Sequence, residues 1–348
     1  MKLLICTQIV DEKDSTLGFF HAWIAALAER FESVEVICLQ EGNHNLPGNV
    51  RVHSLGKEAM SGSRLAKRMH YVSRLVWYTW KLRNRYDTVF VHMNQEYILS
   101  AGPLFKLLRK PVYFWRNHYE GSFLTDIAAA FCVHTFSTSN FSYTARYKKN
   151  KIMPVGVDMS VLEGLPELTR APHSVLSIGR VAPSKNIHLL IEALGQLHKE
   201  GIGFTASVYG KTAKEDESYL EKLKQQAQEL GVEGHAFCGP LPKTETYKAY
   251  RTHEISVNAS RSGMLDKTMF SGMMHGCLLL TCNKDLSGTI PPECSFEEGD
   301  VAGLTDKLRV LLNLPEARAT EIRTSLAEFV GNHSLERLAD DLARALQG

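Results

Sequence analysis

Short apolar runs rich in β-branched and aromatic residues alternate along the chain with longer amphipathic segments. This alternation constrains the fold most, because it is typical of parallel sheets with helices on both faces. We therefore expect an α/β protein with doubly wound sheets. The strand-like runs are KLLIC (2–6), VEVICL (34–39), TVFVH (88–92), PVYFW (111–115) and HTFST (134–138), then SVLSI (174–178), FTASVY (204–209), EISVNA (254–259) and CLLLT (277–281).

The chain of 348 residues is long enough for about two domains of ordinary size. Its periodicity lapses over residues 151–173, which are rich in Pro and Gly, as expected of an interdomain linker. We predict an N-terminal domain over 1–165, a C-terminal domain over 166–333, and a closing helix over 334–348 in a position to pack back on the first domain. Two such Rossmann-like domains would face each other across a cleft, with a ligand at the carboxyl ends of both sheets.

Several features favour a soluble, cytoplasmic protein. No apolar run approaches the roughly 20 residues that span a bilayer. The opening MKLLICTQIV runs directly into DEKD, which favours a buried strand over a signal peptide. The seven cysteines show no metal-ligand spacing, so we expect reduced, buried thiols.

Charge is shared unevenly between the two halves. Residues 1–165 carry 20 basic against 14 acidic side chains, whereas the rest of the chain carries 20 basic against 24 acidic. The basic first half indicates an anionic surface or substrate for the N-terminal domain.

The run SVLSIGRVAPSKN places a glycine and two cations just beyond a predicted strand. Gly179 would let backbone approach a ligand closely, and Arg180 and Lys185 would lie near the N-terminus of the next helix. Together they suit a diphosphate. The alternative is that both cations are ordinary exposed loop charges.

Four segments in this order carry a family resemblance: SIGRVAPSKNIHLLIEAL, VYGK (208–211), HAFCGPL (235–241) and SRSGMLDKTMFSGMMHGCLLLTCN. They resemble the C-terminal half of the retaining glycosyltransferases of family 4 (glycosyl transferases group 1), which have the GT-B fold. STLGFFHAWIAALAERFESVEVICLQEG resembles the first strand, loop and helix of that family, and KIMPVGVDMSVL resembles the segment leading into its second domain. The resemblance thus covers essentially the whole chain.

The resemblance implies roles for particular residues. Arg180, Lys185 and His118 match the catalytic group: the two cations neutralise the departing diphosphate, and the histidine reaches the donor sugar from the N-terminal domain. For His118 the alternative is a surface loop histidine. The expected donor-binding residues are Gly179, Gly210, Gly239, Pro240, Leu241, Gly263, Met264, Leu265, Asp266, Lys267 and Ser271, and the loops around 11–18 and 94–97 supply the acceptor candidates Gly18, Asn94 and Glu96.

The chain departs from the family at two positions. Members usually carry Glu, seven residues, then Glu, where this chain has Gly263 and Ser271. The second glutamate normally accepts from the ribose hydroxyls, and its loss should cost about 1.5 to 3 kcal/mol of donor binding.

Asp266 opens the predicted helix of this same segment. It is placed to cap a helix that begins near Lys267, which would leave amides free for phosphate or sugar oxygens. It is also a candidate for the sugar-hydroxyl contact that position 263 lacks; the alternative is a cap only.

Residues 57–85 combine a single acid with many cations and interleaved aromatics. A basic helix of this kind is typical of an anionic membrane surface; the alternative is a core helix with a solvated basic face. Nucleic acid is not an expected partner because no recognised motif accompanies the charge. The cations are Lys57, Arg64, Lys67, Arg68, Arg74, Lys81, Arg83 and Arg85, beside Glu58, Trp77, Tyr78 and Trp80.

The sequence thus predicts a retaining, metal-independent glycosyltransferase of hexosyltransferase type, without a cofactor. It would move a sugar from a nucleoside-diphosphate sugar to a glycan, a lipid-linked sugar or a small molecule, with membrane association left open. One alternative is a non-catalytic sugar-nucleotide or glycan-binding protein, suggested by Gly263 and Ser271. The other is a sugar-nucleotide epimerase on the same fold.

Overall fold

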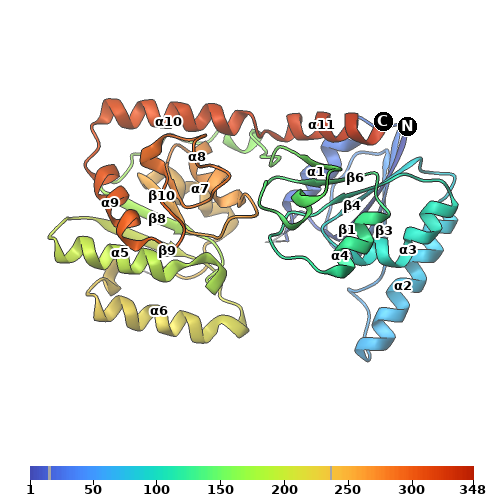
Figure 1. Cartoon of the computed structure of the whole chain (residues 1–348), viewed down its shortest axis with the longest axis horizontal. Coiled ribbons are helices and arrows are strands. Elements are labelled where there is room, and N and C mark those ends of the chain that lie inside the picture. The colour runs from blue at the N-terminus through green and yellow to red at the C-terminus, as the bar shows by residue number, and fades with distance from the viewer. Residues whose placement is uncertain (15–16, 236) are drawn as a thin grey trace. The chain divides into compact units, whose positions relative to one another are not determined.

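The computed structural model describes residues 1–14, 17–235 and 237–348, and it divides the chain into two compact units (Figure 1). The first unit is 1–158 together with 334–348, and the second is 159–333. The division lies at 158/159 rather than at the 165/166 expected from the sequence. The short 3-10 turn Ser160–Leu162 already belongs to the second unit.

The first unit contains a parallel sheet in the order β3-β2-β1-β4-β5-β6-β7. In its register, Cys6 of β1 lies beside Ile37 of β2 on one side and Val91 of β4 on the other. The strands are β1 (Lys2–Val10), β2 (Ser33–Glu41), β3 (Val50–Ser54), β4 (Thr88–His92), β5 (Val112–Trp115), β6 (His134–Ser137) and β7 (Asn150–Ile152). Sequence reasoning did not identify β3 and β7, which are short, partly exposed edge strands.

Helices cover both faces of this sheet because β1 is apolar on both sides. Leu3 and Ile5 belong to a core beneath α1 (Phe19–Ala28) and α11 (Leu335–Gln347). Leu4 and Cys6 belong to a second core beneath three other helices. These are α2 (Arg64–Lys81), α3 (Glu96–Leu107) and α4 (Phe123–Ala130).

The last helix, α11, packs against α1 within the first unit. The Ser334 hydroxyl accepts from the Arg337 amide and caps the helix. Arg30 donates to Glu336 and to Asp340, at 2.7 Å each. A backbone hydrogen bond also connects α11 to the rest of the first unit, because the Leu335 amide donates to the Val157 carbonyl at 2.8 Å.

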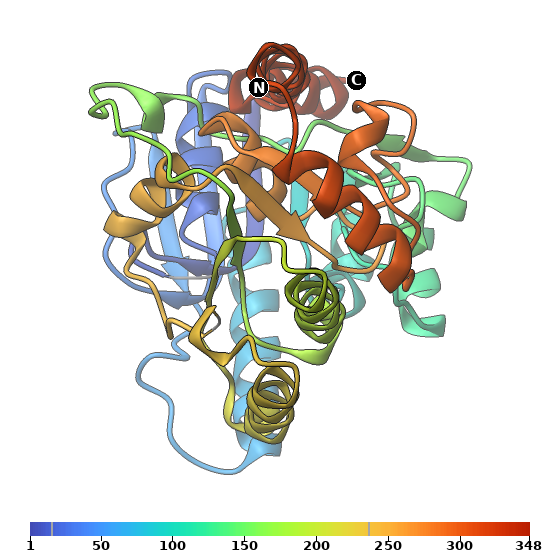
Figure 2. The same ribbon diagram turned by 90° about the vertical axis from the view of Figure 1, so that its left-hand side faces the viewer.

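The second unit contains a parallel sheet in the order β11-β10-β8-β9. Figure 1 shows α5 and α8 on opposite faces of it, and α5 and α6 run side by side in both views (Figure 2). The strands are β8 (Ser174–Ile178), β9 (Thr205–Tyr209), β10 (Ile255–Asn258) and β11 (Leu278–Thr281); the helices are α5 (Ile187–Lys199), α6 (Glu217–Glu229), α7 (Lys243–Thr252), α8 (Lys267–Met274), α9 (Val301–Leu312) and α10 (Glu316–Gly331). Further 3-10 turns of this unit lie at Pro183–Lys185, Lys214–Asp216, Glu233–His235 and Pro292–Cys294, and the first unit has one at Tyr143–Arg146. The expected doubly wound α/β class is confirmed.

None of the described helices combines the length and apolar character needed to cross a bilayer. All seven cysteines are free thiols, and six are buried, as the sequence predicts; Cys238 is the exposed exception.

Candidate functional site

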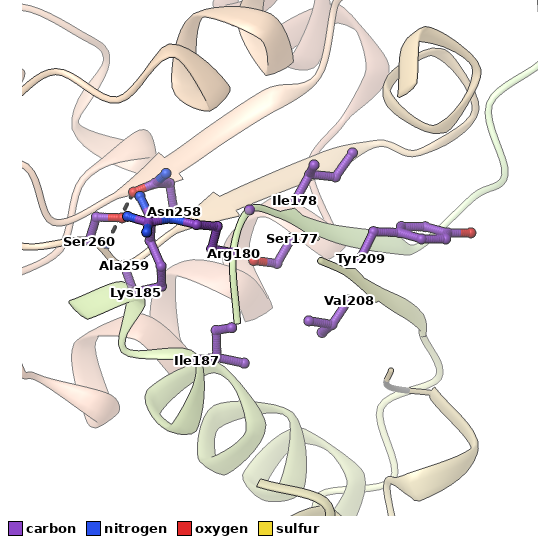
Figure 3. Close-up of a pocket in the computed structure, with 11 residues that line it drawn as sticks. Ser177, Ile178, Arg180, Lys185, Ile187, Val208, Tyr209, Asn258, Ala259 and Ser260 are labelled. Atoms are coloured by element: carbon purple, nitrogen blue, oxygen red, sulfur yellow. Dashed lines mark hydrogen bonds between the residues drawn. The ribbon is translucent and has the colours of Figure 1, made fainter. Parts of the chain in front are cut away.

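A small, partly enclosed pocket lies at the carboxyl ends of β8, β9 and β10 in the second unit (Figure 3). In a parallel sheet this edge presents the strand-to-helix loops and the helix N-termini to a ligand. The pocket is lined by Ser177, Ile178, Gly179, Arg180, Lys185, Ile187, Val208, Tyr209, Asn258, Ala259 and Ser260. Three residues expected from the sequence, Gly179, Arg180 and Lys185, are therefore brought together.

Glycines allow the strand ends to approach one another closely. A Cβ on Gly210 would lie 1.9 Å from the Gly179 carbonyl oxygen, so no larger residue fits there. The Gly210 amide donates to the Gly239 carbonyl at 3.0 Å, and Gly239 has a φ of +75°. Pro240 is exposed and Leu241 is partly buried. These are residues that the family resemblance assigns to donor binding; Ala236, in the same run, lies outside the described residues.

The two cations of the pocket differ in their surroundings. Arg180 is exposed and has no hydrogen-bond or ion-pair partner within the described part of the chain. Lys185 directly precedes Asn186, which begins α5 in a left-handed conformation (φ +50°). The Asn186 side chain donates to the Ala259 carbonyl at 3.0 Å and so ties the start of α5 to the end of β10. The Lys185 ammonium bonds the Asp266 carboxylate, and both side chains are largely buried.

Asp266 is the N-cap of α8, as the sequence predicts. One of its carboxylate oxygens accepts from the Thr268 amide at 3.1 Å, while the other accepts from Lys185. Burial by itself favours the neutral acid, but the charge of Lys185 and the hydrogen bonds outweigh it and lower the pKa of Asp266. Both oxygens of this carboxylate therefore already have partners.

The loop before α8 has a backbone shape that suits glycine. Gly263 is buried with a φ of +106°, a conformation that L side chains rarely adopt. Two contacts fix this loop in place. Asn283 donates to the Met264 carbonyl at 3.0 Å, and the Leu265 side chain is buried. A glutamate at position 263 would therefore be strained in this loop.

Ser271 and Lys267 lie on α8 itself. Lys267 is the first residue of the helix, next to the cap, and is partly buried. Ser271 is partly buried, and its carbonyl accepts from the amide of His275, at 3.2 Å, and from the ring Nδ1, at 2.8 Å. Neither residue lines the pocket of Figure 3.

Sequence reasoning missed two polar residues at the end of β10. Asn258 accepts from the Ser260 amide at 3.0 Å and donates to the Thr268 hydroxyl at 2.9 Å, which links the strand to the start of α8. Ser260 is only 3% exposed, and its hydroxyl has no hydrogen-bond partner among the described residues, although it lines the pocket. The available signal was polar residues directly after an apolar strand.

The remaining sequence candidates lie at the carboxyl edge of the first sheet. His118 follows β5, accepts at Nδ1 from the Glu120 amide at 2.9 Å and stacks on Tyr119. Asn94 and Glu96 follow β4, with Glu96 exposed at the start of α3. Gly18 precedes α1, where a Cβ would lie 2.5 Å from the Asp14 carbonyl. Residues 15 and 16 of the expected loop lie outside the described residues.

Arg116 is a basic residue at that edge which sequence reasoning did not single out. It directly follows β5 and donates to the Glu120 carbonyl at 3.1 Å. Its Nε is buried without a partner among the described residues, and burial lowers the pKa of its guanidinium.

Comparison with known proteins identifies the architecture. Residues 172–314 match the family model of the glycosyl transferases group 1. A curated relative, the GtfA subunit of UDP-N-acetylglucosamine–peptide N-acetylglucosaminyltransferase from Streptococcus pneumoniae, is 25% identical over 176 residues, which are 48% of this chain and 33% of that protein. The chain thus spans about a third of the length of the curated relatives it matches.

Solved structures match over the whole chain. Anabaena HepE in complex with UDP and glucose superposes with a TM-score of 0.76 at 16% identity, covering 100% of both chains. Sucrose-phosphate synthase from Thermosynechococcus elongatus gives 0.76 at 14% identity, covering 100% of this chain and 98% of that one. The chain therefore has the GT-B fold, and its residues 172–314 match the family model of the glycosyl transferases group 1.

Proposed function

We propose that this protein transfers a sugar from a nucleoside-diphosphate sugar to an acceptor hydroxyl, with retention at the anomeric carbon. The observation that carries the proposal is the pocket at the ends of β8 and β10, which is lined by Lys185 and by Arg180, whose guanidinium has no partner among the described residues. Two cations near a helix N-terminus suit a diphosphate.

Arg180 and Lys185 would stabilise the leaving group. The bond between the anomeric carbon and the diphosphate oxygen breaks, and its electron pair goes to the diphosphate. The acceptor oxygen bonds to the same carbon on the same face, and its proton passes to the departing diphosphate. Positive charge aimed at the developing anion lowers the barrier, so the two cations supply the stabilisation for which other enzymes use a metal.

The glycine-rich edge would receive the nucleoside. Gly239 leaves backbone open to close approach, and the Ser260 hydroxyl, which has no partner among the described residues, is available to a phosphate or sugar oxygen. Because HepE is described in complex with UDP and UDP-glucose, uridine diphosphate sugars are the first donors to test. His118 is proposed to contact the donor sugar.

The acceptor would bind to the first unit. The carboxyl edge of its sheet presents Gly18, Asn94 and Glu96, together with the cation of Arg116. We propose a glycan or a lipid-linked sugar as the acceptor, and we propose that the transfer takes place in the cytoplasm.

A binding protein without turnover is the second candidate. The specific observation in its favour is that Lys185 is already neutralised by Asp266, in a site that also lacks a carboxylate at Ser271. Turnover separates the two: the purified protein is incubated with UDP-sugars and a glycan panel, and released UDP is measured. Release that depends on an acceptor supports transfer. Tight donor binding without release supports the binding protein, and a new sugar nucleotide formed without acceptor supports an epimerase.

A further inference from the structure

The helix α2 exposes a continuous apolar stripe to solvent. Five apolar side chains recur along it at intervals of four, three, four and four residues, which places them on one face. They are between 36% and 68% exposed. This α2 face is Leu65, Met69, Val72, Val76 and Trp80, with Trp77 at its edge, 51% exposed.

The stripe is not the side of α2 that packs on the sheet. Within the helix the buried residues are Leu75 and Thr79. Arg74 reinforces that inner side, because it donates to the Ser54 carbonyl at 3.0 Å and to the Tyr78 hydroxyl at 3.2 Å. The α2 face is therefore additional to the contacts that hold α2 in the fold.

Cations surround this face. The helix carries five basic residues and no Asp or Glu, and Arg64, Arg68 and Lys81 are exposed. Two basic side chains cover the tryptophans: Lys81 lies 4.3 Å from the Trp77 ring centroid, and Arg83 lies 4.4 Å from that of Trp80. Apolar side chains bordered by cations and tryptophans suit the boundary between acyl chains and anionic headgroups.

We infer that the α2 face is a membrane-docking surface that lies in the interface of an anionic lipid bilayer. The inference stands on α2 alone and goes beyond the proposed transfer reaction. Charge favours a bilayer over a second copy of this chain as the partner of the α2 face. Two copies joined through α2 would bring their basic residues together, which is unfavourable. An anionic bilayer complements both the positive charge and the apolar stripe.

The tryptophans provide a direct measurement. The chain has four, and Trp23 and Trp115 are buried in the core of the first unit, so Trp77 and Trp80 are the two within reach of lipid. The full chain is mixed with vesicles of phosphatidylcholine, or of phosphatidylcholine with phosphatidylglycerol, with acyl chains brominated to quench tryptophan. Co-sedimentation is measured in parallel, at low and high salt.

We expect sedimentation and quenching with the anionic vesicles only, weakened by salt. Met69→Asp with Val76→Asp should abolish both, while Val310→Asp, at an apolar position 46% exposed on α9, should leave both unchanged. Arg64→Gln with Arg68→Gln should lower the partition coefficient about fivefold for each cation removed. Lys222→Gln with Lys224→Gln on α6 is the matched control. All substituted side chains are solvent-exposed, and unchanged thermal unfolding verifies that the variants fold.

Three outcomes overturn the inference. One is equal binding to neutral and anionic vesicles. Another is sedimentation of the Met69 and Val76 variant like the parent, or binding without quenching. The third is a dimer in sedimentation equilibrium that this variant dissolves while vesicle binding stays the same, which would assign the α2 face to a second copy. None of these readouts uses sugar transfer, so failure here is distinct from failure of the proposed function.

Discussion

Lys185 donates to one carboxylate oxygen of Asp266, and the other oxygen of the same carboxylate caps α8 through the Thr268 amide. A single acid therefore both starts the helix and holds the cation that faces the pocket. A diphosphate arriving in the pocket must share Lys185 with Asp266, whereas Arg180 is free of such competition among the described residues.

Arg180→Ala should remove most transfer activity and leave stability unchanged, because this exposed side chain supports nothing else in the described chain. The expected loss is about 2 to 4 kcal/mol of transition-state stabilisation. Released UDP is measured at saturating donor, with thermal unfolding alongside; near-normal turnover would contradict the assignment.

Lys185→Ala should lose activity and stability together. Removing the cation leaves the Asp266 carboxylate largely buried and unpaired, which costs about 3 kcal/mol when a buried pair is broken. Urea unfolding of this variant beside Arg180→Ala measures the difference. Equal stability of the two would mean that the pair contributes little to folding.

Asp266→Asn should tighten UDP binding several-fold while lowering the stability of the free protein. Asparagine still caps a helix, but Lys185 is no longer neutralised and its charge becomes available to the ligand. Calorimetric titration with UDP measures the affinity. Asp300→Asn is the control, because Asp300 caps α9 through the Gly303 amide and lies outside the pocket. Weaker UDP binding by Asp266→Asn would instead assign Asp266 to positioning Lys185.

Ser260→Ala should weaken donor binding without loss of stability. The hydroxyl is buried and has no partner in the described structure. Removing it therefore leaves no other polar group without a hydrogen bond, and it removes the free-energy cost of burying the hydroxyl itself. Donor affinity and thermal unfolding are measured together. Unchanged affinity would exclude Ser260 from the donor site.

Ser271→Glu should tighten donor binding about tenfold with little change in the rate at saturating donor, since a ribose contact is similar in ground and transition states. Gly263→Glu should instead destabilise the chain by about 1 to 3 kcal/mol, because glutamate is strained at that positive φ. Titration with UDP-glucose and urea unfolding check both. If the parent protein binds no diphosphate sugar and the Ser271 variant does, the proposed transfer reaction is contradicted.

Acidification should destabilise the fold through His253 and His275. Burial, and then the nearby Arg170, lower the pKa of His253; burial, and then Arg251 and Arg170, lower that of His275. The folded state therefore keeps both rings neutral, while the unfolded chain takes up protons once the pH falls through about 6.5. Stability should be full above that pH and decline below it.

His275→Phe should flatten this decline, because it retains the stacking on Tyr250 but cannot titrate. Urea unfolding as a function of pH measures the slope for both proteins. An unchanged slope would show that other groups govern the acid response.

Much of this fold follows from the sequence alone. The nine strand-like runs correspond to β1, β2, β4, β5, β6, β8, β9, β10 and β11, because a strand buried on both faces reads as a continuous apolar run. The same reasoning identified Gly179, Arg180 and Lys185, since the residues directly after parallel strands converge on one edge of the sheet. The helix cap at Asp266 is likewise a local property of its residue type and position.

Only the tertiary structure decided what those residues contact. The bond between Lys185 and Asp266 joins positions 81 residues apart, and periodicity carries no information about such a pairing. The orphaned hydroxyl of Ser260 depends on packing around it, and the positive φ of Gly263 depends on a loop held by Asn283. For α2 the sequence allowed both a core helix and a surface helix, because spacing shows which residues share a face but not whether that face is covered. In the structure the α2 face is exposed to solvent.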